Sequence, residues 1–144
     1  MKIEQIFEEW EKDATIDKTE LGDESIKIPK LHHKYYRVFI SERLLLRKLE
    51  ADLKQLKLEK YEFYTQGPSK ETKDKGWELP ARGVILKSDL PTYIDADKDI
   101  VELTLKIGYQ QEKLELLESI IKSLQVRGYQ IKAAIDWTKF TMGG

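Results

Sequence analysis

The chain of 144 residues contains no cysteine and only two histidines, and these absences exclude several kinds of site. Without cysteine it forms no disulfides and offers no thiolate ligand or thiol nucleophile, a composition that fits a reducing compartment. The histidines, His32 and His33, are adjacent, so on a helix their side chains diverge by about 100°. They cannot jointly hold one metal ion without further ligands. We therefore expect neither a metal site nor a cofactor.

Long apolar runs and catalytic motifs are also missing. No apolar stretch approaches the ~20 residues of a membrane-spanning helix, and the N-terminus lacks a signal-peptide core, which predicts a soluble, intracellular protein without a membrane partner. There is no phosphate-binding glycine loop, nucleophile elbow, HExxH or CxxC. Asp95, Asp97 and Asp99 begin like a calcium loop. However, Ile100 and Lys106 occupy the positions that need glycine and a bidentate glutamate. We predict that the protein is not an enzyme.

The chain is rich in charged residues, and positive and negative residues are unevenly distributed along it. Charged residues make up 35% of the sequence, against about 25% in an ordinary globular domain. Residues 1–26 hold nine carboxylates and three lysines, a local charge of -6, whereas residues 27–60 hold ten Lys or Arg and four carboxylates, a local charge of +6. The formal total is only -1. An acidic head that folds back and neutralises the basic stretch is one interpretation of this pattern.

The basic stretch is also amphipathic. Apolar residues recur at steps of three and four from Leu31 to Phe63, which places them on one face of a helix and leaves the other faces to cations. Pro29 suits a connection into the first turn, and Gly67 with Pro68 predicts an end near Tyr64. At ~1.5 Å per residue, such a helix is roughly 50 Å long. We call this predicted helix the rail and interpret it as a surface for a polyanion.

Aromatic residues alternate with cations along the rail, which favours a single-stranded nucleic acid. Cations neutralise phosphates and aromatic rings stack on bases, and no helix-turn-helix signature favours reading of a duplex. Packing in the core is the alternative for the aromatic residues, and we prefer it for Tyr35, Phe39 and Phe63. The candidate DNA-binding residues are Lys34, Arg37, Arg43, Arg47, Lys54, Lys57, Lys60, Tyr61 and Tyr64.

The pattern predicts a mainly α fold of long amphipathic helices with a small β or extended element in the middle. Residues 1–64 comprise a short acidic helix over 2–13 and the rail. Residues 65–94 comprise a mobile loop at 67–76 and, around Gly83–Lys87, a short strand or an extended arm packed on a helix. Residues 95–144 are C-terminal helices for oligomerisation, which begin with an N-cap among Asp95–Asp99.

The C-terminal segment carries an apolar seam of coiled-coil type. From Ile100 to Ile135, apolar residues follow steps of three and four through five heptads, and Gly128 is a point where the helix is expected to kink or break. A second apolar row, formed by Leu105, Leu116 and Ile120, widens this face, which favours a bundle or a multi-subunit assembly. The candidate oligomerisation residues are Ile107, Leu114, Leu117, Ile121, Leu124 and Ile131.

Four segments, taken in order, carry a resemblance to a known family. They are 12–21 (KDATIDKTEL), 57–64 (KLEKYEFY), 96–99 (ADKD) and 122–132 (KSLQVRGYQIK). Together they resemble the UvsY family, the recombination mediators of T4-like phages. The likeness spans nearly the whole chain and weakens between Gly67 and Leu90.

The resemblance implies a non-catalytic protein in the cytoplasm of the infected bacterial host. It implies sequence-independent binding of single-stranded DNA, a ring-shaped homo-hexamer or homo-heptamer assembled through the C-terminal region, and loading of a RecA-like recombinase onto strands covered by single-strand-binding protein. It further implies that basic positions just before Tyr61 contact DNA, which include Lys60 here. One family lysine is replaced by Leu58, so its role passes to Lys57 or is lost. The alternative is a non-enzymatic coiled-coil adaptor that binds another protein.

Overall fold

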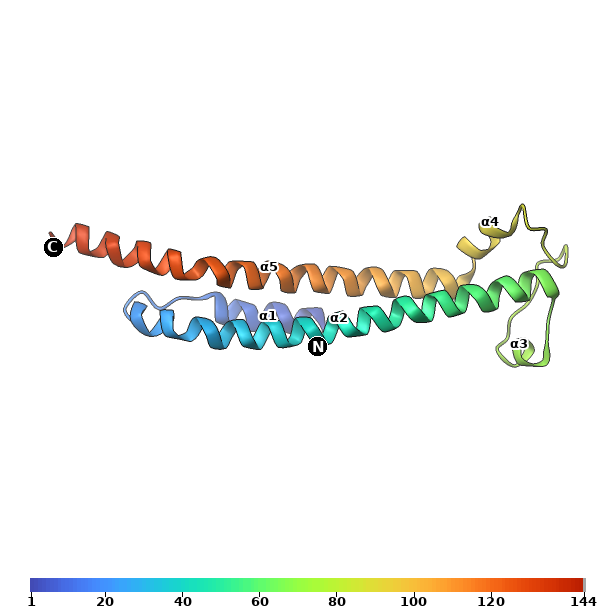
Figure 1. The fold of residues 1–144 in the computed structure, drawn as a ribbon, viewed down its shortest axis with the longest axis horizontal. Helices are drawn as coiled ribbons and strands as arrows, with labels where there is room; N and C mark the ends of the chain where they lie inside the picture. The colour runs from blue at the N-terminus through green and yellow to red at the C-terminus, as the bar shows by residue number, and fades with distance from the viewer. Residues whose placement is uncertain (144) are drawn as a thin grey trace. The chain divides into compact units, whose positions relative to one another are not determined.

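Helices account for the regular secondary structure of residues 1–143, which are the residues described by this computed structural model. The helices are α1 (Ile3–Ala14), α2 (Leu21–Gln66), α3 (Lys70–Asp74), α4 (Leu90–Asp95) and α5 (Lys98–Thr141), shown in Figure 1. The mainly α prediction is confirmed. No β-strand occurs within 1–143, so the strand predicted around Gly83–Lys87 is not found.

The chain forms two compact units. Unit 1 contains residues 1–44 and the chain from residue 111 onward, and unit 2 contains residues 45–110. Helix α1 therefore belongs to unit 1, and α3 and α4 belong to unit 2, while α2 and α5 each contribute residues to both.

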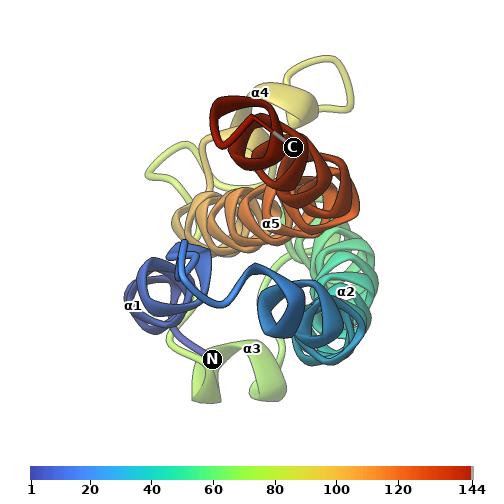
Figure 2. The same ribbon diagram turned by 90° about the vertical axis from the view of Figure 1, so that its left-hand side faces the viewer.

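In unit 1, the short helix α1 lies alongside α2 and α5 (Figures 1 and 2). Ile6 of α1 is fully buried, as are Leu117 and Leu124 of α5. A 12-residue helix is too short to persist alone in water, so α1 owes its stability to this packing. The short acidic helix predicted for the N-terminus is thus present and docks on the helices of its own unit.

Helix α2 begins ten residues earlier than the predicted rail and contains Pro29 in its interior. The sequence prediction placed Pro29 at the helix start, because proline has no N–H to donate to the carbonyl four residues earlier. That carbonyl belongs to Ser25, and both Ser25 and Pro29 are exposed. Water can therefore bond the freed carbonyl, which reduces the cost of proline at this position.

Helix α5 starts where the sequence predicts and continues past the point where a break was predicted. The Asp97 carboxylate Oδ1 accepts hydrogen bonds from the N–H groups of Asp99 and Ile100, at 2.9 and 3.2 Å, and so caps the helix. At Gly128 the helix continues without interruption to Thr141. Glycine costs only about 1 kcal/mol in a helix, and the strong apolar pattern on both sides outweighs this.

The core of unit 2 joins the C-terminal end of α2 to the segment before α5. Phe63, Tyr64, Ile85 and Leu90 are buried together, with Trp77 partly buried against them. The Ile85 N–H donates to the Tyr64 carbonyl at 2.9 Å, close to the point where α2 ends. Residues 77–89 therefore form an irregular arm that contains turns and packs on the end of α2, instead of the strand or the extended arm that the sequence predicts.

Within residues 67–76, for which a mobile loop was predicted, the structure has the short helix α3. Ser69 caps it: its hydroxyl oxygen accepts from the Thr72 N–H at 3.3 Å, and its own N–H donates to the Thr72 hydroxyl at 2.8 Å. Gly67, with φ of +92°, provides the turn that separates α2 from this helix. Local capping thus orders a segment that has no large apolar side chain.

Candidate nucleic-acid interface

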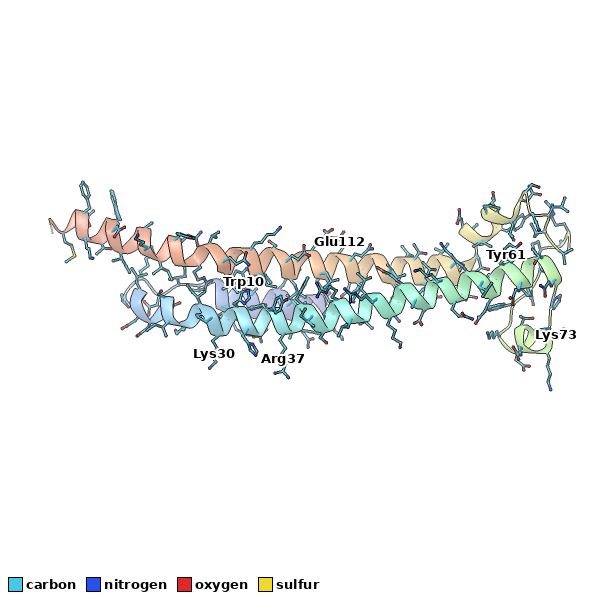
Figure 3. All side chains as sticks on the ribbon, viewed as in Figure 1. Trp10, Lys30, Arg37, Tyr61, Lys73 and Glu112 are labelled. Atoms are coloured by element: carbon cyan, nitrogen blue, oxygen red, sulfur yellow. The ribbon has the colours of Figure 1, made fainter. Side chains whose placement is uncertain are left out.

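Four of the predicted DNA-binding cations keep their side chains in solvent. They are Arg37, Arg47, Lys54 and Lys57, and none is paired with a carboxylate within residues 1–143. Figure 3 shows Arg37, together with Lys30, projecting from α2 away from α1 and α5. Because no internal partner neutralises these four groups, they are available to an anion from outside the chain.

Three of these cations and one tyrosine share a side of α2 in unit 2. Arg47, Lys54 and Tyr61 are seven residues apart, about two helical turns each, and Lys57 lies one turn from both Lys54 and Tyr61. We call Arg47, Lys54, Lys57 and Tyr61 the cationic face. Leu58, beside it, is 50% exposed, and Tyr61 is 39% exposed. The face thus combines unpaired charge with accessible aromatic and aliphatic surface.

Lys34, at the N-terminal end of the predicted rail, is held by the acidic helix α1. Its Nζ lies 2.7 Å from Glu9 Oε2 and 2.7 Å from Asp13 Oδ2, and the Tyr35 hydroxyl donates to the same Asp13 oxygen at 2.7 Å. Partial burial lowers the pKa of Lys34, but its bonds to the two carboxylates outweigh burial and raise it overall. The acidic head therefore neutralises this cation, as one interpretation of the sequence proposed.

Arg43 is half-buried. Its guanidinium lies 5.3 Å from the centre of the Phe39 ring, and Phe39 itself is buried in unit 1, as predicted. Such a cation–π contact contributes roughly 0.5–2 kcal/mol. Arg43 is thus less available to an external anion than Arg47, one turn further along the helix.

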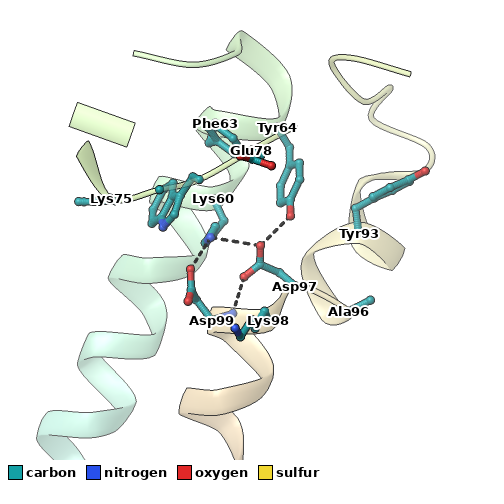
Figure 4. A pocket seen from close by; sticks show the side chains of 12 residues that line it. Lys60, Phe63, Tyr64, Lys75, Glu78, Tyr93, Ala96, Asp97, Lys98 and Asp99 are labelled. Atoms are coloured by element: carbon teal, nitrogen blue, oxygen red, sulfur yellow. Dashed lines mark hydrogen bonds and ion pairs between the residues drawn. The ribbon is translucent and has the colours of Figure 1, made fainter. Parts of the chain in front are cut away.

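Lys60, the position that the family resemblance makes a DNA contact, is buried instead. Only 3% of the residue is exposed. Its Nζ lies 2.7 Å from Asp99 Oδ2 and 3.2 Å from Asp97 Oδ2 (Figure 4). The same atom lies 3.7 Å from the centre of the Trp77 ring. A lysine held by two carboxylates and an indole cannot also face solvent. The predicted DNA-binding role of Lys60 is therefore not supported by its position.

Tyr64, another predicted DNA contact, belongs to the same buried cluster. Its hydroxyl donates to Asp97 Oδ2 at 2.6 Å, and burial, this hydrogen bond and the negative charge of Asp97 raise its pKa well above the usual range. Burial raises the pKa of Asp97. Bonds from Tyr64, the Ile100 N–H and Lys60 outweigh that effect, so the pKa of Asp97 lies below its usual value. We call Lys60, Tyr64, Trp77, Asp97 and Asp99 the Lys60 cluster.

Sequence reasoning missed one cation, Lys87, which lies on the arm of unit 2. It is exposed, has no carboxylate partner within the described range, and lines a groove together with Lys57 and Tyr61. It escaped notice because the run Gly83–Lys87 was interpreted as a strand. A lone lysine outside the rail offered no signal of its own.

The predicted oligomerisation residues are buried within the chain's own fold. Leu117 and Leu124 are 0% exposed and Ile131 is 2% exposed, and Ile107, Leu114 and Ile121 are each 8% exposed. Helical periodicity identified a buried face correctly, and the role of these residues in oligomerisation stays a prediction. The large aromatic side chains that remain exposed toward the end of α5 are Tyr129, Trp137 and Phe140, and Met142, just beyond the helix, is also exposed.

The ring of His32 stacks on that of Tyr36, with centroids 5.7 Å apart. Within the part of the chain that the structure describes, no three His, Cys, Asp or Glu side chains gather where they could hold a metal ion. In that same part, no helix combines the length and apolarity required to cross a membrane.

Comparison with known proteins identifies the family. Residues 9–144 match the family described as "Recombination, repair and ssDNA binding protein UvsY". The chain belongs to the UvsY family. The recombination protein uvsY of Enterobacteria phage T4 is 26% identical over 144 residues, which is 99% of each chain. The family resemblance drawn from the four sequence segments is thereby confirmed.

Solved structures agree with this assignment. A crystal structure of the bacteriophage T4 recombination mediator protein UvsY (lattice type II) matches with a TM-score of 0.80 at 26% identity, covering 99% of this chain and 98% of that chain. Another (lattice type IV) has a TM-score of 0.79 at 23% identity, covering 98% and 99%. The helical fold of this UvsY-family protein is therefore that of the phage T4 structures along nearly its whole length.

Proposed function

We propose that this protein is a recombination mediator that binds single-stranded DNA without sequence specificity through the cationic face of α2. The observation that carries the proposal is that Arg47, Lys54 and Lys57 are exposed, lie on one side of one helix and lack carboxylate partners within residues 1–143. Membership of a family described by recombination, repair and ssDNA binding supports it. Cations of this kind contact phosphates, which are the same for every base sequence.

A single cationic face is too short to hold DNA tightly. From residue 47 to residue 61 the helix rises roughly 21 Å at about 1.5 Å per residue, so it reaches only a few phosphates. Phosphate contacts weaken steeply as salt rises. Several faces acting on one strand would make each later contact intramolecular, with a high effective concentration. The proposed function therefore requires several copies of the chain in one assembly.

We propose that this assembly is a ring of six or seven copies and that the C-terminal segment 95–144 provides the contacts between them. Because the seam residues are covered within the chain, we propose that neighbouring copies meet at the exposed end of α5. Tyr129 is 78% exposed, Trp137 66% and Phe140 75%, and the rings of Trp137 and Phe140 stack with centroids 5.8 Å apart. Aromatic side chains gathered on a surface in this way mark interaction sites. In this scheme residues 1–64 carry the DNA contacts and residues 65–94 brace them.

The proposed mechanism is non-catalytic. A strand held along several cationic faces takes a shape that suits a RecA-like recombinase better than it suits single-strand-binding protein. Because each of these proteins prefers one shape of the DNA, the strand passes from the single-strand-binding protein to the recombinase. Mediation in this sense needs no active site, only a difference in the contacts that the two DNA shapes allow.

The decisive experiment compares two triple variants of equal charge. Arg47→Ala/Lys54→Ala/Lys57→Ala should weaken binding of every strand sequence and lower the slope of log K against log salt by about two, because each lost phosphate contact removes about 0.7. Lys12→Ala/Lys18→Ala/Lys122→Ala changes net charge equally at exposed positions outside α2 and should leave the slope nearly unchanged. Fluorescence anisotropy with labelled oligonucleotides at several salt concentrations measures both. Equal slopes for the two variants would refute the proposed interface, and no binding by the wild type would favour an adaptor that binds another protein.

A further inference from the structure

A groove of about 340 Å³ lies beside the cationic face, entirely within unit 2. Tyr61 and Lys57 of α2 form one wall, and Lys87 of the arm lies at the groove together with Pro91 and Ile94. Figure 3 shows Tyr61 near the C-terminal end of α2. The volume lies at the lower end of the range of about 300 to 1,000 Å³ for small-molecule sites. It suits one planar group rather than a larger ligand.

The fold itself does not use the polar groups of this groove. The Tyr61 hydroxyl has no hydrogen-bond partner among residues 1–143, and 39% of the residue is exposed. Lys57 and Lys87 are likewise exposed, and neither is paired with a carboxylate in that range. This contrasts with Tyr64, one turn away, whose hydroxyl is bonded to Asp97. Tyr61 thus stays available where Tyr64 is committed to the core.

The chemistry of the lining specifies the kind of occupant. The Tyr61 ring, Pro91 and Ile94 offer apolar surface to the two faces of a flat group. Lys57 and Lys87 attract anions, whereas the Asp95 carboxylate in the same groove repels an anion that enters fully and accepts N–H donors. A nucleobase has flat faces and N–H groups at its edge, and it carries phosphates on either side. A free phosphate or a carboxylate would meet Asp95 unfavourably.

We propose that this groove seats one unstacked base of a single DNA strand, with its face on the Tyr61 ring and its flanking phosphates at Lys57 and Lys87. This inference rests on the proposed function, and it adds a base contact to the phosphate contacts of the cationic face. Stacking of bases on aromatic rings tolerates any sequence, because every base has a π-face. The seat is therefore compatible with binding that does not depend on sequence.

The seat also provides a way to distinguish a single strand from a duplex. Phosphates alone do not make that distinction, since both forms carry them. A base in a duplex must lose its pairing and stacking before it can enter a pocket, which costs free energy, whereas a base in a single strand is already accessible. The groove thus gives each subunit a preference for unpaired DNA.

The test uses the full-length protein and three labelled probes of equal length: a single strand, an abasic single strand and a duplex. The wild type should bind the base-bearing strand roughly fivefold to a hundredfold more tightly than the abasic strand, as expected for one stacked base. Tyr61→Leu should remove that difference and leave the affinity for the abasic strand unchanged. Lys87→Ala should weaken binding of both single strands. Tyr36→Leu, which alters an exposed tyrosine of α2 in unit 1, is the matched control and should behave as the wild type.

The outcomes separate this inference from the proposed function. If the wild type binds the abasic and base-bearing strands equally, the base seat is wrong and the phosphate interface stands. If it binds none of the probes, both fail. A third outcome would assign the groove to a protein partner. In that case the wild type binds the abasic strand as tightly as the base-bearing strand. In addition, an acidic peptide that contains tryptophan displaces the base-bearing strand from the wild type but not from Tyr61→Leu. Circular dichroism confirms that each variant retains its helical content.

Discussion

The ammonium group of Lys60 lies 3.7 Å from the centre of the Trp77 ring, so a residue of α2 is covered by a residue of the arm. Asp99, at the start of α5, holds the same ammonium at 2.7 Å. Lys60 therefore connects three segments of unit 2 that are distant in sequence. The salt-dependent affinity for DNA that the family resemblance assigns to this position is expected to come from Lys57 and Lys54 instead.

Replacing Lys60 should affect stability more than DNA binding. Lys60→Met keeps an apolar side chain of similar length but leaves the buried Asp97 carboxylate without its cation. We expect the free energy of unfolding to fall by about 3 kcal/mol, the cost of removing one partner of a buried pair, while the salt slope of DNA binding stays as in the wild type. Urea denaturation and anisotropy measure the two effects. A stable variant with a reduced slope would show that Lys60 contacts DNA directly.

Protonation of the Asp97 carboxylate should lower the stability of the fold in acid. Its native pKa lies below its usual value, so ionised Asp97 stabilises the fold above the unfolded-state pKa of about 3.9. That stabilisation is lost as the pH falls through the native pKa. Between about pH 5 and pH 2, Asp97→Asn should therefore show a smaller decrease in the free energy of unfolding than the wild type. Asp74→Asn, at an exposed carboxylate of α3, serves as the control. A wild-type pH profile for Asp97→Asn would contradict the assignment.

Assembly should depend on the end of α5. Trp137→Glu/Phe140→Glu places charge on two exposed aromatic positions, so we expect the subunit fold to persist while the assembly dissociates. Sedimentation velocity reports the assembly and circular dichroism the fold. In our scheme, affinity for long oligonucleotides then falls with the loss of multivalency. An intact assembly in this variant would place the subunit interface elsewhere.

Leu117 and Leu105 provide a contrast between two leucines of one helix. Leu117 is 0% exposed and Leu105 is 69% exposed, although both belong to the apolar rows that the sequence predicts for an assembly face. Leu117→Ala should lower the free energy of unfolding by about 3 kcal/mol. Leu105→Ala should change it by less than about 0.5 kcal/mol. Denaturant unfolding at one protein concentration compares them. Equal effects would mean that Leu105 is covered by another subunit.

Local signals predicted the local features of this fold. The Asp97 cap and the end of α2 near Gly67 depend on neighbouring residues, and the sequence reveals them. The course of α2 through Pro29 was not predicted, because the exposure of the freed carbonyl depends on tertiary structure. The seam of α5 was recognised as a buried face, but periodicity does not tell whether the covering helix comes from the same chain or from another.

In the candidate site, too, the sequence reveals local features but not long-range contacts. Lys57 and Lys60 look alike in the sequence, and both lie in a basic, aromatic stretch. Only Lys60 turns toward Asp99, which is 39 residues further along the chain. Such a pairing depends on which side of α2 the arm and α5 cover. Likewise, Lys87 comes close to Tyr61 only because the arm returns to α2, a long-range contact that residue spacing does not encode.

Leu58 is 50% exposed beside the cationic face. A strand that covers it removes aliphatic carbon from water, and burial of apolar area lowers the heat capacity. Isothermal titration calorimetry between 10 and 35 °C should therefore find a binding enthalpy that becomes more favourable on warming, and Leu58→Lys should flatten that trend while making the interaction more sensitive to salt. At this position the protein therefore has less electrostatic attraction for DNA and gains a hydrophobic contact, which persists at high salt concentration.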